Sequence, residues 1–127
     1  MTDSSRILPC REPADVFHCG QVANHFARAG GFSIERARSI ACAAAELAQH
    51  ALRNGGGDLL VRTVGGSRPG LLLVCTDRSG VRDGGRLSVV PEAVDELTVK
   101  RQRNGGLLIV ARCDRAHRPP RAVSLAS

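Results

Sequence analysis

The longest regular pattern of apolar and polar positions lies between Ser33 and Asn54. Its apolar residues recur every three or four positions, which places them on one side of a helix. They are Ala37, Ile40, Ala41, Ala44, Leu47, Ala48, Ala51 and Leu52. The opposite side carries Ser39, Ala43, Glu46, His50 and Arg53. Because Ser33 is a suitable N-cap and Asn54 a suitable stop before three glycines, we predict one amphipathic helix with a polar stripe.

A shorter amphipathic helix is predicted before it, from Val16 to Ala29. Asp15 or Ala14 is a suitable first residue, and the two glycines at positions 30 and 31 end the pattern. The apolar stripe of this helix consists of Phe17, Val22, Phe26 and Ala29. A short strand from Arg6 to Cys10 is predicted before the helix.

The segment after the long helix predicts a β-hairpin. Residues Asp58 to Val64 alternate moderately, and residues 65–70 have the glycine, serine and proline content of a turn. Leu71 to Thr76 is almost entirely apolar, which is typical of a central strand covered on both faces, or covered on one face and lining a pocket with the other. The order helix, helix, strand, strand predicts an α+β two-layer sandwich, with the helices on one face of a mostly antiparallel sheet.

The pattern weakens between Arg82 and Arg103, where we predict only a short helix from Glu92 to Leu97. A long, weakly patterned segment between two glycine motifs is typical of a mobile lid. Leu107 to Arg115 is predicted to be a final helix that begins at Asn104. The segment from Arg121 to Ala126 is long enough for one edge strand at most.

Composition narrows the class of protein. A length of 127 residues and 43% apolar content indicate a single globular domain, residues 1–127. No apolar run approaches membrane-spanning length, and the N-terminus lacks the pattern of a signal peptide.

The five cysteines have no C-x-x-C spacing, so we expect a cytoplasmic protein with reduced thiols and no zinc site. The net charge of +6 favours acidic or phosphorylated partners, but no stacking aromatics accompany the arginines, which argues against a nucleic-acid platform.

Three short motifs carry the candidate chemistry of the chain. They are Glu46-Leu47-Ala48-Gln49-His50-Ala51, Asp77-Arg78-Ser79-Gly80-Val81 and Asn104-Gly105-Gly106-Leu107-Leu108. In this order they resemble the N box, the D-x-G-x-G adenine box and the glycine-rich second box of the histidine-kinase-like (GHKL) ATPases. The small anti-sigma factor and switch serine kinases of that superfamily are most similar in size and layout. No Walker A sequence occurs, which excludes a P-loop nucleotide site.

The resemblance extends from Val16 to Arg115 and implies a Bergerat-type ATP-binding fold with a shortened C-terminal end. It also implies an ATP lid over residues 82–103, with ATP as ligand and Mg²⁺ as its metal. Glu46 would polarise the attacking water or serine hydroxyl. His50 occupies the position at which the family has an asparagine that binds Mg²⁺, and an imidazole nitrogen is a poor ligand for this hard ion.

The candidate nucleotide-binding residues are Asp77, Ser79, Gly80, Val81, Asn104, Gly105, Gly106 and Leu107. A carboxylate at the end of a buried strand can accept a hydrogen bond from the adenine amine, which would select adenine over guanine, but the same residues suit a plain turn. Glycines at a helix start offer backbone N–H groups to phosphate, but they also begin ordinary helices.

Three functions follow as hypotheses. The resemblance implies a serine/threonine kinase that phosphorylates a serine of a STAS-domain antagonist protein and so controls a sigma factor; a homodimer is a further expectation. The second hypothesis is a pseudokinase, a regulatory binding module with the same fold that transfers no phosphate, because His50 replaces the metal ligand. The third is a small basic nucleic-acid-binding protein, for which a steep salt dependence of duplex binding is the test.

Overall fold

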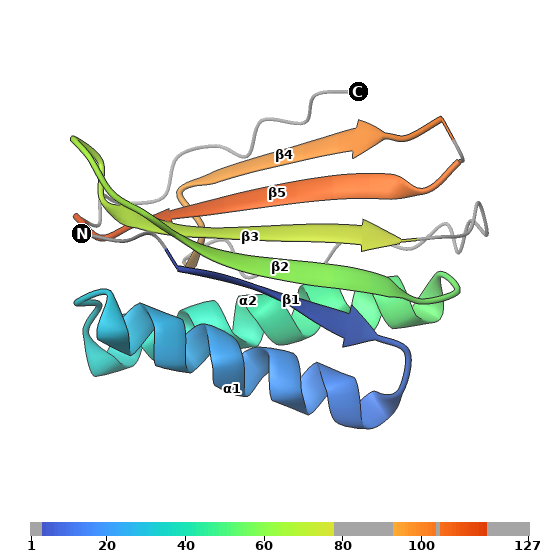
Figure 1. Ribbon diagram of the computed structural model, residues 1–127, viewed down its shortest axis with the longest axis horizontal. Coiled ribbons are helices and arrows are strands. Elements are labelled where there is room, and N and C mark those ends of the chain that lie inside the picture. Colours follow the sequence, from blue (N-terminus) through green and yellow to red (C-terminus); the bar gives the residue numbers. More distant parts are fainter. Residues whose placement is uncertain (1–3, 78–92, 104, 117–127) are drawn as a thin grey trace.

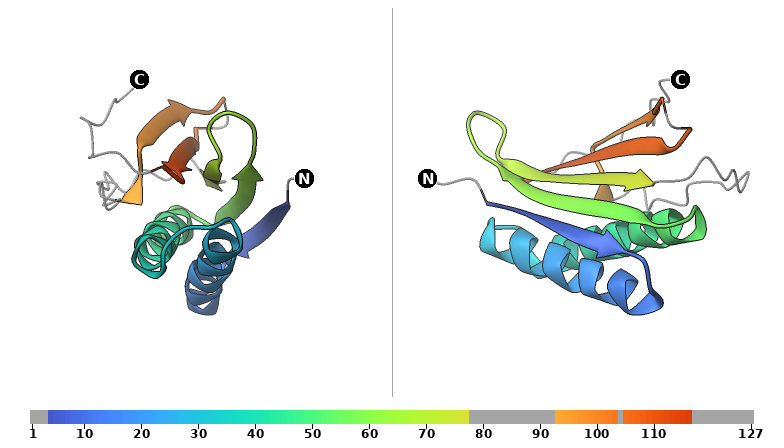
Figure 2. Two further views of the ribbon diagram at one scale, coloured as in Figure 1. Left: turned by 90° about the vertical axis from the view of Figure 1, so that its left-hand side faces the viewer. Right: turned by 45° about the vertical axis from the view of Figure 1, so that its right-hand side comes forward.

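The computed structural model describes residues 4–77, 93–103 and 105–116, and these form one five-stranded sheet and two helices. The strands are β1 (Ser5–Cys10), β2 (Gly57–Val64), β3 (Gly70–Asp77), β4 (Glu96–Arg101) and β5 (Leu107–Asp114). Their order in the sheet is β1-β2-β3-β5-β4, and every neighbouring pair is antiparallel. Helices α1 (Pro13–Ala29) and α2 (Ile34–Arg53) lie side by side on one face of the sheet (Figures 1 and 2). The predicted α+β two-layer architecture is therefore confirmed.

Helix α2 agrees with the prediction at both ends. The Ser33 hydroxyl accepts a hydrogen bond from the Arg36 backbone N–H at 3.1 Å, which is N-cap geometry. Asn54 ends the helix, and the two glycines after it have φ values of 89° and 93°, a left-handed conformation that glycine adopts without strain. The predicted apolar positions that are fully buried are Ala37, Ile40, Ala44, Leu47, Ala48 and Ala51.

The predicted polar stripe of α2 is wrong at Ala43, which is fully buried. Arg36, Ala43 and His50 are spaced seven residues apart and therefore share one side of the helix. The Arg36 guanidinium donates to the backbone oxygen of Asp114 at the end of β5, and His50 contacts Asp77 at the end of β3. This side of α2 therefore faces the sheet and not the solvent.

Helix α1 begins earlier than predicted, at Pro13. Asp15, a suitable first residue by sequence, lies within the first turn. Its carboxylate accepts hydrogen bonds from the backbone N–H groups of Arg11 and Glu12, at 2.9 and 3.0 Å. These bonds satisfy donors that a helix start leaves without partners, so the short connection between β1 and α1 is well fixed.

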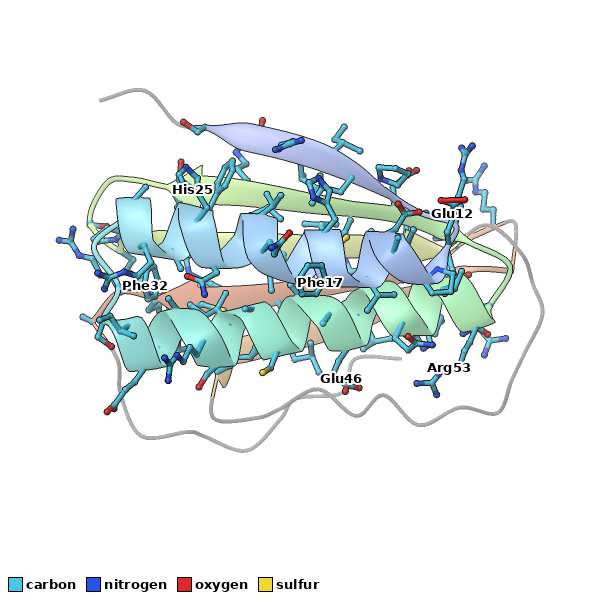
Figure 3. All side chains as sticks on the ribbon, turned by 90° about the horizontal axis from the view of Figure 1, so that it is seen from below. Glu12, Phe17, His25, Phe32, Glu46 and Arg53 are labelled. Carbon is cyan, nitrogen blue, oxygen red and sulfur yellow. The ribbon has the colours of Figure 1, made fainter. Side chains whose placement is uncertain are left out.

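The predicted apolar stripe of α1 is wrong at Phe17, which is 69% exposed on the outer side of the helix (Figure 3), and at Ala29, which is also exposed. The buried side consists of Cys19, Val22, Ala23 and Ala27. Small residues bring the two helices close together, since a Cβ on Gly20 would lie 3.3 Å from the backbone oxygen of Ala41. Within the described part of the chain, neither helix combines the length and the apolar character needed to cross a membrane.

The predicted hairpin is present as β2 and β3, and the core lies between the sheet and the helices. The fully buried apolar strand residues on the helix-facing side are Leu8, Cys10, Leu59, Val61, Leu71, Leu73, Cys75, Ile109, Ala111 and Cys113. On the opposite face of the sheet, Leu60, Leu72 and Val74 are half-buried. Strand β3 is therefore covered on its helix-facing side and partly open on the other.

The predicted C-terminal helix is wrong. Leu107–Asp114 is strand β5, which pairs with β3 on one side and with β4 on the other. A tight turn joins β4 to β5: the Gln102 N–H donates to the Gly106 oxygen at 2.7 Å, and Gly105 has a φ of 92°. A short apolar run is compatible with a helix or with a buried strand, and pairing on both edges decides for the strand.

The segment over residues 82–103 differs from its prediction where it can be compared. The short helix predicted over Glu92–Leu97 is wrong at its last two residues, which begin strand β4. Residues 96–101, the C-terminal part of the predicted lid, pair with β5. Residues 82–92 lie outside the described residues, as does the segment 121–126 that was predicted to form an edge strand.

Candidate functional site

The candidate site lies where α2 passes the end of β3. The Cys75 thiol donates to the backbone oxygen of Leu47 at 3.3 Å, which holds the strand against the helix about one turn before His50. Two residues further along β3, Oδ2 of Asp77 lies 3.5 Å from Nε2 of His50. Their side chains are only 4% and 12% exposed, respectively. The structure therefore brings residues of the first two motifs into direct contact.

Asp77 is held from two further directions. Its Oδ1 accepts a hydrogen bond at 3.2 Å from the backbone N–H of Leu107, the first residue of β5. On its other side Asp77 lies opposite Gly57 of β2. A Cβ atom at Gly57 would collide with the backbone oxygen of Thr76, so glycine is needed for the strands to approach this closely. One carboxylate oxygen thus faces β5 and the other faces α2.

Asn54 orients the imidazole from the end of α2. Its amide nitrogen donates to the backbone oxygen of His50 at 2.8 Å and lies 3.5 Å from the imidazole Nδ1. Because Nδ1 faces this donor and Nε2 faces the Asp77 carboxylate, we assign the imidazole proton to Nε2; both contacts are 3.5 Å, which is longer than an ordinary hydrogen bond. From the sequence, Asn54 was predicted only to end the helix. Its spacing of four residues from His50 indicates that the two side chains lie next to each other on the helix.

The proton on His50 Nε2 is incompletely satisfied. This nitrogen is buried and has no hydrogen-bond partner within the described residues, since its 3.5 Å contact with Asp77 is longer than a hydrogen bond. A buried donor without an acceptor is costly in a finished protein core. The site therefore contains one N–H group for which a bound molecule could provide an acceptor.

Glu46 lies one turn before His50 on α2 and is half-buried. It makes no hydrogen bond or ion pair with any described residue. Figure 3 shows Glu46 and Arg53 on the side of α2 that is away from α1. A carboxylate without a partner at this position is available to accept a proton or a hydrogen bond from a molecule outside the helical layer.

The described residues of the site do not offer the ligands that Mg²⁺ prefers. This ion prefers six oxygen ligands in octahedral geometry, and His50 offers a nitrogen. Of the two Asp77 carboxylate oxygens, Oδ1 already accepts the hydrogen bond from Leu107, which leaves only Oδ2 beside His50. Across the part of the chain that the structure describes, no cluster of three or more His, Cys, Asp and Glu side chains could hold a metal ion.

The third motif does not form the predicted phosphate site. Gly105 and Gly106 belong to the β4–β5 turn and not to a helix start, so they present no helix dipole to a phosphate. Leu107 reaches the candidate site through its backbone N–H, which contacts Asp77. The remaining predicted residues of the nucleotide site, Ser79, Gly80, Val81 and Asn104, lie outside the described residues.

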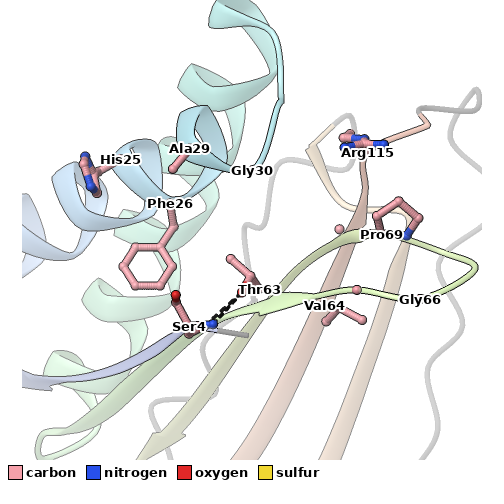
Figure 4. A pocket seen from close by; sticks show the side chains of 12 residues that line it. Ser4, His25, Phe26, Ala29, Gly30, Thr63, Val64, Gly66, Pro69 and Arg115 are labelled. Carbon is pink, nitrogen blue, oxygen red and sulfur yellow. Dashed lines mark hydrogen bonds between the residues drawn. The ribbon is translucent and has the colours of Figure 1, made fainter. Parts of the chain in front are cut away.

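A hollow of about 740 Å³ lies at the opposite end of the β2–β3 hairpin (Figure 4). Phe26 points into it from α1 toward Ser4 and Thr63, and Arg115 lies on its far side beside Pro69. The backbone N–H of Ser4 donates to the Thr63 hydroxyl at 2.8 Å. None of the predicted site residues lines this hollow.

Comparison of the chain with protein-family models and with curated proteins found no match. The site is therefore interpreted from its own geometry and from the motifs of the sequence.

Proposed function

We propose that this protein binds an adenine nucleotide, ATP or ADP, beside Asp77 and acts as a regulatory module without phosphoryl transfer. The observation that carries the proposal is the buried pair of His50 and Asp77, whose imidazole N–H has no hydrogen-bond acceptor among the residues that the structure describes. Buried polar groups rarely lack a hydrogen-bond partner, so each such group is a candidate for contact with a bound molecule; within the described residues the Nε of Arg36 is another, and only His50 belongs to the motifs. The three motifs, in the order of the histidine-kinase-like ATPases, supply the class of ligand.

Adenine fits the hydrogen-bonding pattern of Asp77. The carboxylate is already held by the N–H of Leu107 on one oxygen and faces the His50 N–H with the other. The exocyclic amine of adenine is a donor of the same kind, so it can take the place of the imidazole at Oδ2. Guanine has a carbonyl oxygen at the equivalent position, which a carboxylate repels.

Two features favour binding without transfer. The glycines expected to hold phosphate form a strand turn, and the described residues do not fit Mg²⁺. The proposal therefore assigns no chemical step to a metal. The expected partner is a STAS-domain antagonist protein that controls a sigma factor, and this part of the proposal rests on the motif resemblance alone.

Titration calorimetry with ATP and ADP tests the proposal. Asp77→Asn should weaken both nucleotides by roughly 1.5–3 kcal/mol, because it removes a hydrogen bond to a charged acceptor. Asp58→Asn is the matched control: it makes the same change of charge on β2, at a position opposite Thr76 whose side chain lies on the other face of the sheet from Asp77, and should leave the affinity unchanged. Wild-type protein that binds neither nucleotide, or an Asp77→Asn variant with unchanged affinity, contradicts the proposal.

A second candidate function, the serine kinase, is favoured by one observation. Glu46 is a carboxylate without a partner in the described residues, one turn from His50, where a general base for a serine hydroxyl would be needed. If the chain is a kinase, Glu46→Gln should abolish phosphate transfer and leave nucleotide affinity almost unchanged. The His50 substitution described in the Discussion separates the two candidates further.

A further inference from the structure

Two buried cysteines lie in contact at the start of the helical layer. Cys10 ends β1 and Cys19 lies in the second turn of α1, and neither side chain is exposed. Their Sγ atoms are 3.9 Å apart. The other thiols are placed differently: Cys75 donates to the backbone of α2, Cys113 is buried in β5, and Cys42 is exposed. Cys10 and Cys19 are the two cysteines whose sulfur atoms meet.

We propose that Cys10 and Cys19 form a reversible disulfide with a hydroperoxide as the oxidant. This inference does not depend on the proposed function, because it uses neither the nucleotide nor any residue of that site. A disulfide has an S–S length of about 2.05 Å, so the sulfur atoms must approach by about 2 Å. Among the described strands, β1 is an edge strand that pairs with β2 alone, so fewer backbone contacts oppose a small movement of Cys10 than in a central strand.

The backbone keeps the two thiols together. Only residues 11 and 12 connect β1 to α1, and the Asp15 carboxylate accepts hydrogen bonds from both of their N–H groups. Cys10 lies opposite Gly57 in the antiparallel pair, which fixes the end of the strand. The fold therefore holds the two sulfur atoms in contact. If one of the two thiols is oxidised, the other is close enough to react with it.

The chemistry balances with one peroxide per disulfide. The Cys19 thiolate attacks one oxygen of hydrogen peroxide, the O–O bond breaks, and a sulfenic acid and hydroxide form. The Cys10 thiolate then attacks the Cys19 sulfur, the S–S bond forms, and the sulfenic oxygen leaves as hydroxide. The two thiol protons convert both hydroxides to water. In total, the two thiols lose two electrons and two protons, and the peroxide is reduced to two water molecules.

Cys19 is the thiol expected to react first. The contact with the Cys10 sulfur lowers the pKa of Cys19, although burial opposes the effect. The same contact, together with burial, raises the pKa of Cys10. Since both side chains are fully buried, the oxidant must be small, and hydrogen peroxide is close in size to a water molecule. Bulky thiol reagents should reach only Cys42 in the folded protein.

The test uses the folded full-length chain with Cys42→Ser, which removes the exposed thiol. After treatment with hydrogen peroxide, denaturation and alkylation, we expect the number of free thiols to fall from four to two, since the chain has five cysteines and this variant lacks one. Cleavage after arginine separates residues 7–11 from residues 12–28. These two peptides should be recovered as one cross-linked species by mass spectrometry and separated by dithiothreitol.

Controls make the result decisive. Cys10→Ala and Cys19→Ala, each in the Cys42→Ser background, should give no cross-link between these peptides. Four remaining thiols under conditions that oxidise Cys42 in the unchanged chain would overturn the proposal. A cross-link to Cys75 or Cys113, or sulfinic acid at Cys19 without a cross-link, would also overturn it. A cross-link that forms only after unfolding in urea would show that the folded contact is not the cause.

Discussion

The two ends of the β3–β5 pair hold acidic side chains on the same backbone arrangement but with different partners. Asp77 ends β3 at one end of the sheet, and Asp114 ends β5 at the other. Each lies opposite a glycine of the neighbouring strand, Gly57 and Gly70. At both glycines a Cβ atom would collide with the backbone of the partner strand. The difference between the two ends therefore lies in the side chains that each acid meets.

Permanent charges surround the acids at the Asp114 end. Asp114 accepts from Arg68 at 2.6 Å and from Arg112 at 2.8 Å, and the neighbouring Asp95 pairs with the buried guanidinium of Arg36 at 3.4 Å. Asp95 also accepts the Asp114 backbone N–H at 2.7 Å. A guanidinium stays charged at any physiological pH and presents several donors in a fixed geometry. The ion pairs at this end of the sheet therefore have a structural role.

The Asp77 end has one titratable partner at a longer distance. The His50 imidazole lies 3.5 Å away with an incompletely satisfied N–H. A contact of this length is weaker than the 2.6 and 2.8 Å contacts that Asp114 makes with its two arginines. Comparison of the two ends shows that a buried acidic side chain alone does not indicate a functional site. What distinguishes the Asp77 end is a contact longer than a hydrogen bond, and this is the place at which the proposed ligand would bind.

The largest expected effect on stability is at the Asp114 end. Asp95→Ala leaves the Arg36 guanidinium, whose side chain is 14% exposed, without its charged partner and removes the acceptor for the Asp114 N–H. Loss of one partner of a buried ion pair should lower the free energy of unfolding by about 3–5 kcal/mol. Denaturant unfolding measures this value.

Glu96→Ala is the matched control for this substitution. Glu96 pairs with Arg68, and the two side chains are 60% and 55% exposed. An exposed pair of this kind should contribute only about 0–1 kcal/mol. Equal losses in the two variants would show that Asp95 is no more important than a surface pair, and the contrast between the ends of the sheet would fail.

The parts of the fold that sequence predicts are those with a local pattern. Helix α2 has a 3.6-residue period and a serine cap, and both can be identified without knowledge of the rest of the chain. The β2–β3 hairpin has two strand-like segments and a turn rich in glycine and proline. His50 and Asp77 were likewise predicted as site residues from their motifs, and the structure places them in contact.

The remaining features depend on contacts between distant segments. Arg36 and Asp95 are 59 positions apart, and no local pattern reports that they meet. Phe17 fits an apolar period, but the packing of α1 against α2 and the sheet leaves it outside the core. For β5 a local signal did exist: Asn104-Gly105 between two short strand-like segments is typical of a hairpin turn. The apolar run after it was interpreted as a helix, because length alone does not separate the two.

A smaller effect is expected on acid stability, again at the Asp114 end. Burial raises the pKa of Asp114, but hydrogen bonds from Arg68 and Arg112 outweigh it and hold the pKa below its ordinary value of 3.8. A carboxyl with a depressed native pKa stabilises the fold fully above the unfolded value and loses this contribution as the pH falls through the native pKa. The stability difference between wild type and Asp114→Asn should therefore be constant at pH 5–6 and shrink below about pH 4. Urea unfolding at each pH measures it, and a difference that stays constant to pH 2.5 contradicts the assignment.

The smallest effect on stability, and the most informative one on function, is expected for His50→Asn. Because the 3.5 Å contact with Asp77 is longer than a hydrogen bond, the free energy of unfolding should change by about 1 kcal/mol or less. The change frees Oδ2 of Asp77 for a ligand and provides an amide oxygen, a ligand type that suits Mg²⁺. ATP affinity in the presence of Mg²⁺ should therefore rise, and calorimetry with and without the ion measures the gain.

The same variant separates the regulatory module from the kinase. If wild type transfers no phosphate and His50→Asn gains slow hydrolysis or transfer to a STAS partner, the site lacks only its metal ligand, and adding Glu46→Gln should remove the gain by eliminating the proton acceptor. If wild type already turns over ATP as fast as the variant, His50 is a working ligand and the regulatory proposal is wrong. If neither protein binds ATP, both functions are wrong and the weakly paired acid at the end of β3 has another partner. In each case the Asp114 end serves as the reference, because no substitution there should alter nucleotide binding except through loss of the fold.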